Sequence, residues 1–353
     1  MLGAYPAFIR RRWVSSMSIR YLKAGLLVVL ALVLVSPAYA EPAPLVRISS
    51  ENGPSHVQTR LLQRFVDNVR ARAGDRLVID FQHSGNLFRD RDIVSALQQG
   101  KVEMALPGTW QLDRFDPNIG ALLLPMFYGR DATTTDRLLD GDMGREVNRR
   151  LEEVLGLHVL GRWMHLGFAH LYTLDRPVRR QDEIAGLRIR TPGGEVNNRR
   201  LAAMGAEVIT VPWPDLPQAL RIRRVDGLLS THATVASERL WAHGVRYCFE
   251  DRQYFPQYVP LFSDLFWSRL SPDLRDILTS TWEELVDEGR REAAVAQEAA
   301  RRELLEHGVK IIQPDAKDLR VWRNRLVESQ MQWAVDMGID IELVSILRRN
   351  LGD

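Results

Sequence analysis

The fold of this chain is decided by residues 186–230, GLRIRTPGGEVNNRRLAAMGAEVITVPWPDLPQALRIRRVDGLLS. In this stretch, short apolar segments with strand character alternate with segments in which apolar residues recur at helical spacing. Such alternation is typical of α/β proteins, in which helices cover the faces of a sheet. The sequence predicts strands at 187–191, 207–211 and 225–230, with helices at 196–204 and 216–222 between them.

Three residues stand at or just beyond the ends of these strands: Arg190, Trp213 and Ser230. Ligands of open α/β sheets bind outside the carboxyl ends of the strands, so we expect these side chains to converge on one crevice. Arg190 is the sharpest candidate, because its planar guanidinium matches a carboxylate and keeps its charge when water leaves. The alternatives are a solvated charge or a structural ion pair for Arg190, and core packing for Trp213.

Five short motifs run through this stretch: Gly186 to Pro192 (GLRIRTP), Met204 to Ala206 (MGA), Val211 to Trp213 (VPW), Gln218 to Leu220 (QAL) and Val225 to Gly227 (VDG). Together they resemble the core signature of the DctP-type substrate-binding proteins of tripartite ATP-independent periplasmic (TRAP) transporters. The resemblance implies an α/β, two-domain periplasmic binding protein fold of type II-like form. Each domain would be a mixed sheet flanked by helices, with a long helix linking the two.

Further segments resemble the same family in the same order, so the resemblance covers nearly all of residues 45–350. Apolar residues recur at helical spacing from Pro272 to Glu306 and predict a helix of ~45 Å or more, longer than one domain is wide. Within the resemblance, this helix lies across both domains. The other matching segments are 81–87 (FQHSGNL), 96–105 (ALQQGKVEMA), 124–128 (LPMFY), 159–163 (VLGRW) with 167–168, and 266–272.

Two positions depart from the family pattern. Many members carry an arginine directly after the Gly-Phe pair of the crossover into the second domain, where this chain has Ala169. Many carry an asparagine near the end of the Val-Asp-Gly strand, where this chain has Ser230. The loss of one polar clamp indicates either a different kind of ligand or a clamp rebuilt from Arg162, His165 or His170.

Three further residues are candidates for ligand contact. The resemblance places Trp110 and Trp163 near the cleft, where flat indole rings would exclude water and sandwich a small organic ligand. Asn52 lies in the turn after the first strand and would supply a polar contact from the opposite domain. Core packing is the alternative for the two tryptophans, and a solvated turn is the alternative for Asn52.

The predicted mature chain of 313 residues exceeds what one core usually supports, so two domains are expected. We expect a first α/β domain at 41–165, with contributions from about 254–272 and the C-terminal region, and a second at 166–253. A linking helix at 272–307 and C-terminal helices at 308–353 complete the chain, and the crossings between the domains would form the hinge. In the first domain the sequence predicts strands at 46–49, 77–81 and 102–106, and helices at 56–72 and 91–99.

The first forty residues read as a signal peptide. They contain five basic residues and no acidic one, an apolar run at 24–35 and an A-x-A cleavage site ending at Ala40. The apolar run is too short to span a membrane. We expect the ordinary secretory route, cleavage near Ala40 and a periplasmic mature protein, with Met1 or Met17 as the start.

Composition narrows the function further. Without the five basic residues of the leader, 42 basic residues face 45 acidic ones, a net charge of −3, so the whole-chain pI of 8.8 does not indicate nucleic-acid binding. Cys248 is the single cysteine, which excludes an intrachain disulfide and favours a buried apolar role. The eight histidines include no pair at i and i+4, so we expect neither a metal site nor a cofactor.

We therefore expect a periplasmic solute-binding protein of a TRAP transporter that captures a small organic acid, such as a dicarboxylate, by hinge closure. It would be a monomer that delivers its ligand to integral membrane permease subunits. Two alternatives stay open: a binding protein that serves a sensory receptor, and a periplasmic enzyme. Against an enzyme, the sequence lacks a G-x-S-x-G elbow, an H-E-x-x-H pair, a P-loop and a dinucleotide fingerprint.

Overall fold

The protein contains a five-stranded and a six-stranded β-sheet, called here the first and the second sheet. Three neighbouring strands at one end of the second sheet run parallel to one another. The computed structural model describes residues 42–130 and 132–351, so the predicted leader lies outside the described residues. From Ala43 onward the chain forms one compact unit. The predicted β-α-β-α-β alternation is confirmed: β7 (Arg188–Thr191) pairs in parallel with both β8 (Glu207–Thr210) and β9 (Gly227–Thr231), and the intervening helices are α7 (Glu195–Ala203) and α8 (Leu216–Arg221).

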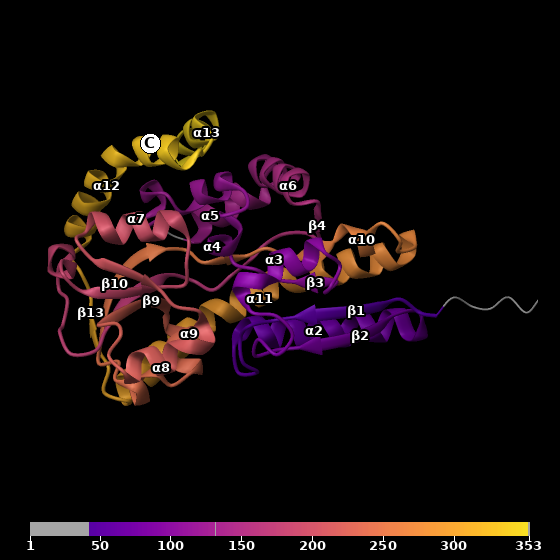
Figure 1. Ribbon diagram of the computed structural model, residues 1–353, viewed down its shortest axis with the longest axis horizontal. Coiled ribbons are helices and arrows are strands. Elements are labelled where there is room, and N and C mark those ends of the chain that lie inside the picture. The colour runs from indigo at the N-terminus through magenta and orange to yellow at the C-terminus, as the bar shows by residue number, and fades with distance from the viewer. Residues whose placement is uncertain (1–41, 131, 352–353) are drawn as a thin grey trace, which may run out of the picture. The chain divides into compact units, whose positions relative to one another are not determined.

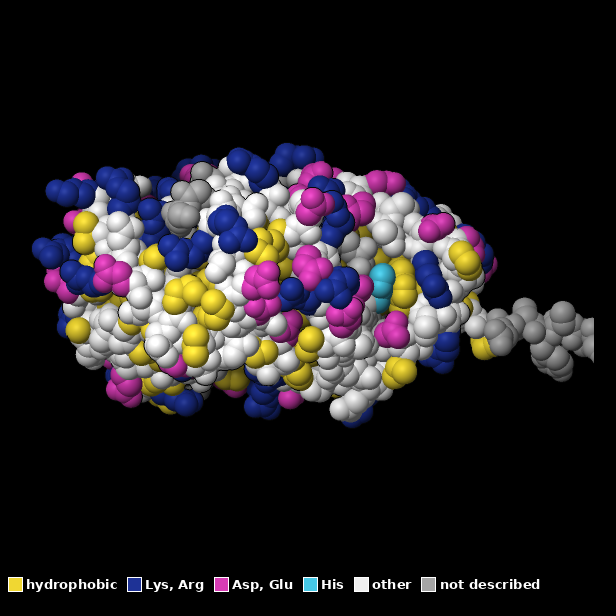
Figure 2. Space-filling model, turned by 90° about the horizontal axis from the view of Figure 1, so that it is seen from above, with side chains coloured by type: hydrophobic (Ala, Val, Ile, Leu, Met, Phe, Trp, Pro, Cys, Tyr) yellow, Lys and Arg dark blue, Asp and Glu magenta, His cyan; other side chains and the backbone are white. Residues whose placement is uncertain are grey.

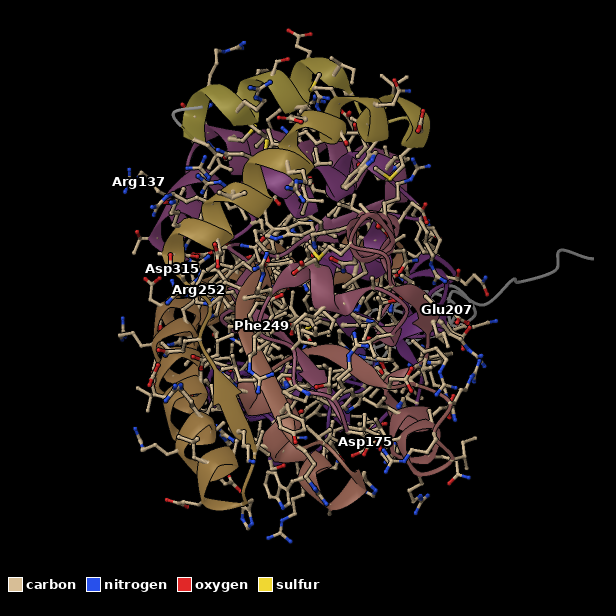
Figure 3. All side chains as sticks on the ribbon, turned by 90° about the vertical axis from the view of Figure 1, so that its left-hand side faces the viewer. Arg137, Asp175, Glu207, Phe249, Arg252 and Asp315 are labelled. Atoms are coloured by element: carbon tan, nitrogen blue, oxygen red, sulfur yellow. The ribbon has the colours of Figure 1, made fainter. Side chains whose placement is uncertain are left out.

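The sheet that contains this unit is mixed. Its strand order is β13-β10-β6-β9-β7-β8, with β6 (Ala169–Thr173) antiparallel to both β9 and β10 (Tyr247–Tyr254), and β13 (Lys310–Ile312) parallel to β10. The register of β10 against β6 shifts between Phe249 and Tyr254, two positions flanking a bulge in which Arg252 has a φ of 50°. Figure 3 labels Phe249 and Arg252 on this strand. The bulge bends the strand as the chain leaves the sheet.

The first sheet combines four strands from the first half of the chain with one strand that comes much later, at 261–263. Its order is β2-β1-β3-β12-β4, and β1 pairs in parallel with β2 and β3, whereas β12 is antiparallel to β3 and β4. The sheet is therefore mixed, as predicted, and the chain returns to it after forming five of the six strands of the second sheet. The strands are β1 (Leu45–Ser49), β2 (Val78–Gln82), β3 (Met104–Ala105), β4 (Leu157–Val159) and β12 (Leu261–Ser263).

We call the elements around the first sheet the first lobe and those around the second sheet the second lobe. The chain passes from the first lobe to the second through β5 (Met164–His165) and returns through β11 (Gln257–Tyr258), and these two short strands pair antiparallel. The two crossings expected to form the hinge thus run side by side.

One long helix connects the lobes, as predicted. Helix α11 (Pro272–Glu306) begins with a proline at its first turn, which suits the fixed φ of proline, and packs on α2 (Val57–Ala73) of the first lobe and α9 (His232–Ser237) of the second (Figure 1). It buries an apolar stripe that includes Leu278, Trp282 and Val286. The two-domain α/β fold with a linking helix is therefore confirmed.

The remaining helices complete the lobes. Helix α12 packs on α7 of the second lobe and on η3 (Pro125–Phe127) of the first, where the backbone N–H of Met126 donates to Oε1 of Gln330 at 3.0 Å. These helices are α3 (Asp90–Gln98), α4 (Thr109–Leu112), α5 (Ala132–Asp140), α6 (Asp142–Leu155), α10 (Asp264–Trp267), α12 (Ala316–Met337) and α13 (Ile341–Leu351).

The surface carries both signs of charge. Figure 2 shows basic and acidic side chains interspersed on one face, with hydrophobic side chains scattered between them. In the parts of the chain that the structure describes, no helix is both long enough and apolar enough to cross a bilayer.

Candidate ligand-binding site

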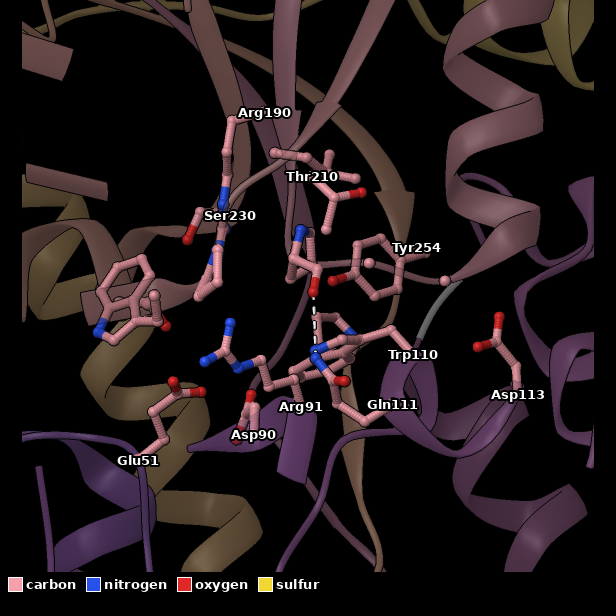
Figure 4. Close-up of a pocket in the computed structure, with 18 of the residues that line it drawn as sticks. Glu51, Asp90, Arg91, Trp110, Gln111, Asp113, Arg190, Thr210, Ser230 and Tyr254 are labelled. Carbon is pink, nitrogen blue, oxygen red and sulfur yellow. Dashed lines mark hydrogen bonds between the residues drawn. The ribbon is translucent and has the colours of Figure 1, made fainter. Parts of the chain in front are cut away.

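A cavity of about 340 Å³ lies where the carboxyl ends of β7, β8 and β9 face the first lobe. Figure 4 shows Arg190 and Ser230 on its second-lobe wall, with Glu51 and Asp90 on the first-lobe wall opposite. The volume lies within the range of small-molecule sites. Its position agrees with the rule that ligands bind beyond the carboxyl ends of strands in open α/β sheets.

Arg190, the third residue of β7, presents an uncompensated charge to this cavity. The residue is 3% exposed, its Nε donates to the carbonyl oxygen of Val211 at 2.9 Å, and its Cζ lies 5.6 Å from the ring centroid of Trp213. Within residues 42–130 and 132–351, no oxygen accepts a hydrogen bond from its two Nη atoms. Burial lowers the pKa of Arg190 to about 10, so the side chain stays charged at neutral pH. Two parallel N–H donors are thus available to a carboxylate.

Two tryptophans and two tyrosines form the aromatic part of the lining. Trp213 is partly exposed between two prolines, whereas Trp110 is buried and meets Tyr254 and Tyr258 edge to face, with ring centroids 6.3 and 5.2 Å apart. The Nε1 atom of Trp110 is buried and has no hydrogen-bond partner among the described residues.

The predicted polar contacts Ser230 and Asn52 also line the cavity. Both are buried, and Ser230 stands at the carboxyl end of β9. The amide nitrogen of Asn52 donates to Oε1 of Gln58 at 2.5 Å and to the hydroxyl of Tyr258 at 3.4 Å. Gln58, the second residue of α2, therefore fixes the orientation of Asn52 in the turn after β1.

Two carboxyl groups occupy the first-lobe wall (Figure 4). Glu51 follows β1, and Asp90 is the first residue of α3. Burial, with the neighbouring charge of Asp90, raises the pKa of Glu51 to about 10, and burial also raises the pKa of Asp90. Both carboxyl groups are therefore harder to ionise than carboxyl groups in water.

Contacts between the lobes surround the cavity. Nε2 of Gln111 donates to the carbonyl oxygen of Pro192 at 3.1 Å, and the backbone N–H of Glu195 donates to Oδ2 of Asp113 at 2.8 Å. Burial raises the pKa of Asp113 to about 6. At other edges, Nε2 of His56 lies 3.1 Å from Oγ1 of Thr234, and an Arg89–Asp215 ion pair spans 3.2 Å. The lobes are thus closed over the cavity.

Three of the predicted contacts, Arg162, Trp163 and His170, are not among the residues that line the cavity. The guanidinium of Arg162 binds the carboxylates of Glu283 and Asp287 at 2.6 and 2.9 Å, which holds the crossover segment against α11. Trp163 is buried, and its Nε1 donates to Oδ1 of Asn148 at 2.8 Å.

His170 has a role within its own sheet. Its Nδ1 accepts the backbone N–H of Arg252 at 3.2 Å, so the ring supports the bulge of β10. Burial lowers the pKa of His170 well below its usual value. The related candidate His165 is also buried, with Nε2 3.2 Å from Oδ2 of Asp136. None of these side chains rebuilds a second cationic clamp at the cavity.

Ala169, the position at which many members of the family carry an arginine, lies on β6 with Thr231 and Tyr254 as its register partners. Both partners line the cavity. A hydroxyl-bearing wall therefore stands beside the position of the missing arginine.

Sequence reasoning missed several lining residues, including Asp90, Gln111, Asp113, Tyr254 and Tyr258. Two of them could have been predicted, because Tyr254 and Tyr258 lie just after residue 253, where the chain was expected to leave the second domain, and a crossing segment lies at the cleft. Asp90 and Asp113 carried no pattern of their own. Among the described residues, no cluster of histidine, cysteine, aspartate and glutamate side chains could hold a metal ion.

Two lobes joined by crossing strands, with a polar cavity between them, define a two-domain binding protein. The chain belongs to the bacterial extracellular solute-binding proteins of family 7, the DctP family, whose sequence profile matches residues 48–334. It is 24% identical over 280 residues to the C4-dicarboxylate-binding protein DctB of Bacillus subtilis, covering 79% of this chain and 78% of that protein. It is 24% identical over 270 residues to the 2,3-diketo-L-gulonate-binding periplasmic protein YiaO of Escherichia coli, covering 76% and 81%.

Solved structures agree on the fold. The sugar acid binding protein DctPAm of Advenella mimigardefordensis, in complex with galactonate, matches with a TM-score of 0.81 at 20% identity, covering 87% of this chain and 97% of that one. A TRAP periplasmic solute-binding protein of Sulfurospirillum deleyianum with bound succinate matches with a TM-score of 0.80 at 18% identity, covering 87% and 98%.

Proposed function

We propose that this protein captures a small organic acid through its carboxylate and delivers it to a TRAP-type membrane permease. The observation that carries the proposal is the buried guanidinium of Arg190, whose Nη atoms face a cavity of about 340 Å³ without a partner among the described residues. A buried charge without a partner is costly, and a carboxylate ligand would remove that cost. Relatives named for C4-dicarboxylate and 2,3-diketo-L-gulonate binding support an acid as the ligand.

Capture would proceed by hinge closure. The carboxylate pairs with Arg190 on the second lobe, and the first lobe then folds over the ligand and expels water. In the drier cavity each hydrogen bond strengthens, while every unpaired polar group of a wrong ligand becomes more costly. The hinge lies at the paired crossing strands β5 and β11, between a first domain at 41–165 and a second at 166–253.

Under this proposal, the protein binds and releases its ligand without changing it chemically. The cavity wall offers an arginine, paired carboxyl groups and hydroxyls, and the sequence contains no nucleophile elbow, H-E-x-x-H pair or P-loop. A sensory receptor could read the same closed form, and a TRAP permease encoded beside this chain would favour transport over sensing.

Export completes the proposed role. The leader at 1–40 is removed near Ala40, and the mature chain works in the periplasm as a monomer that meets the permease in its closed form. The intact mass of the exported protein tests this directly, because cleavage at Ala40 predicts an N-terminal Glu41.

A thermal-shift screen tests the proposed function. Small mono- and dicarboxylic acids and sugar acids are compared with their primary amides, which keep the size but lose the charge. At about 100-fold over Kd, binding adds roughly 2.7 kcal/mol to the free energy of unfolding, so a hit raises Tm clearly. We expect hits among the acids and none among the amides. Equal stabilisation by an acid and its amide contradicts carboxylate capture.

A further inference from the structure

The first-lobe wall of the cavity holds two acidic side chains that the carboxylate of the ligand does not use. Glu51 is 8% exposed, and its Oε1 is buried without a hydrogen-bond partner among the described residues. Asp90, on the same wall, stands beside it across from Arg190 (Figure 4). Burial raises the pKa of both carboxyl groups, and a cation beside them would lower both pKa values and compensate the charge that burial penalises.

Among the described residues, no basic side chain forms an ion pair with either carboxyl group. Arg190 and Arg114 act on the pair only through space, and Arg114 is exposed. The side chain of Arg91, which also lines the cavity, is 59% exposed and pairs with Asp92 at 3.3 Å. The remaining neighbours are neutral: the hydroxyl of Tyr258 and the amide of Asn52, which is already bound to Gln58.

The cavity thus has a buried guanidinium on one wall and two acidic side chains on the other, of which Glu51 is buried and Asp90 is partly exposed. We infer that the Glu51–Asp90 pair binds a cationic nitrogen, so that the ligand is a small zwitterion with a carboxylate at one end and an ammonium or amidinium group at the other. The inference rests on the proposed function, because it takes the carboxylate end to lie on Arg190. It adds a second recognition site and narrows the ligand class.

Charge and hydrogen bonding favour a cation over other groups at the pair. An ammonium supplies three donors and one positive charge, which suits two neighbouring carboxyl groups better than a neutral donor does. A hydroxyl supplies one donor and no charge. A second carboxylate is repelled by the pair and excluded, which gives selectivity against dicarboxylates.

The experiment compares acids within two matched sets of three, whose members differ only in the group at the end opposite the carboxylate. The shorter set is γ-aminobutyrate, γ-hydroxybutyrate and succinate. The longer set is δ-aminovalerate, δ-hydroxyvalerate and glutarate. Affinities of the purified full chain are measured by calorimetry or thermal shift. We expect an amino acid of one length to bind at least about tenfold tighter than its hydroxy and dicarboxylate partners, a difference of about 1.4 kcal/mol.

Two isosteric variants, Glu51→Gln and Asp90→Asn, keep the shape of the wall and remove the charge. Each is expected to weaken the amino acid at least about tenfold and to change the hydroxy acid by no more than about twofold. Unfolding midpoints of both variants, compared with that of the unaltered chain, check that folding is retained. Loss of binding of every probe in Arg190→Ala shows that the carboxylate end is held as proposed.

The inference is overturned if no amino acid of the series stabilises the unaltered chain, if a hydroxy acid or dicarboxylate binds more tightly, or if Glu51→Gln weakens all probes equally. In the last two cases, dependence on Arg190 leaves the proposed function standing. If binding instead survives Arg190→Ala, the proposed function itself is contradicted.

Discussion

Two arginines of the second lobe, Arg190 and Arg200, are comparably buried, at 3% and 0% exposure, and burial lowers the pKa of each to about 10. Their surroundings differ. The guanidinium of Arg200 donates to the carbonyl oxygen of Leu123 at 2.9 Å, to Oδ1 of Asn197 at 2.6 Å and to Oε1 of Gln253 at 3.4 Å. Among the described residues, the guanidinium of Arg190 makes only one hydrogen bond, from Nε to the carbonyl oxygen of Val211. The guanidinium of Arg200 is therefore engaged in structural hydrogen bonds, whereas the Nη atoms of Arg190 are available to a ligand.

A buried acid on β10 predicts a dependence of stability on pH. Burial raises the pKa of Asp251 to about 7, although Leu171 N–H and Nε2 of Gln253 donate to its carboxylate. Since the folded pKa lies above the unfolded value, the stabilisation is complete below about pH 4 and is lost as pH rises through about 7. Between pH 5 and pH 8 the free energy of unfolding should fall in the unaltered chain. We expect this fall to be larger than that in the Asp251→Asn variant by on the order of 2 kcal/mol.

Urea unfolding at the two pH values measures this difference. The exposed Asp182, paired with Arg180 at the surface, is the matched control, and Asp182→Asn should keep the pH dependence of the unaltered chain. Identical pH profiles for Asp251→Asn and the unaltered chain would show that this carboxyl does not titrate as burial implies.

Individual residues were predictable from sequence only where a general rule fixed their position. Arg190, Trp213 and Ser230 stand at strand ends, and the carboxyl-end rule brought them to one cavity. Arg162 and His170 were placed by proximity along the chain, but their partners, Glu283 and Arg252, are 121 and 82 residues away. No local pattern reveals such partners.

At the level of elements, helix α7 depends on the opposite lobe for its N-terminal cap. Its N-cap residue is Gly194, which has no side chain to accept the first N–H groups. Asp113 supplies that acceptor from the first lobe, at 2.8 Å from the backbone nitrogen of Glu195. This hydrogen bond forms only when the lobes are closed, so it stabilises the closed form.

We expect Asp113→Ala to weaken ligand binding about fivefold, the equivalent of the ~1 kcal/mol that a helix cap contributes. Asp113→Asn keeps an acceptor oxygen and should restore much of the affinity. Calorimetry on both variants measures the effect. An equal loss of affinity in Asp113→Ala and Asp113→Asn would show that Asp113 acts through its charge and not as the acceptor that caps α7.

The close approach of α11 to α2 gives a second prediction at this scale. A Cβ at Gly289 would lie 2.7 Å from Cδ2 and 3.0 Å from Cδ1 of Leu61, a fully buried residue. Alanine is the better helix former by about 1 kcal/mol, but overpacking costs about 1–3 kcal/mol. We therefore expect Gly289→Ala to lower the free energy of unfolding in urea. An increase would show that the helices can separate without cost.

Elements were more predictable than residues, because periodicity and turn residues act locally. The long helix begins and ends at Pro272 and Glu306, as predicted, and the strands and helices of residues 186–230 differ from prediction by only one or two residues. The strand predicted at 102–106 is shorter, since only Met104 and Ala105 find pairing partners on both sides. Strand pairing between distant segments sets such limits, and the sequence does not display it.

At the scale of the whole molecule, polar contacts join the lobes at the edges of the cavity. They include the Arg89–Asp215 ion pair, whose side chains are 40% and 49% exposed, and the His56–Thr234 hydrogen bond. Exposed ion pairs contribute only about 0–1 kcal/mol, so these contacts alone hold the lobes together weakly. The ligand is expected to supply the rest.

Small-angle scattering tests this expectation. The radius of gyration of the mature chain should decrease when a bound acid saturates the cavity, because the ligand shifts the population toward the closed form. Arg190→Ala at the same ligand concentration should show no decrease. A ligand-free chain as compact as the saturated one would contradict hinge closure.

The central claim is that Arg190 holds the carboxylate of the ligand. The most direct measurement is calorimetry of one bound acid against Arg190→Ala and Arg188→Ala, two arginines of the same strand. Arg188 is part exposed and pairs with Asp226 at 2.6 Å, so its loss should leave affinity within about twofold. Loss of a partner from a buried charged pair costs about 3–5 kcal/mol, so Arg190→Ala should weaken binding by about two to three orders of magnitude. Unchanged affinity in Arg190→Ala, with a normal unfolding midpoint, would contradict the account.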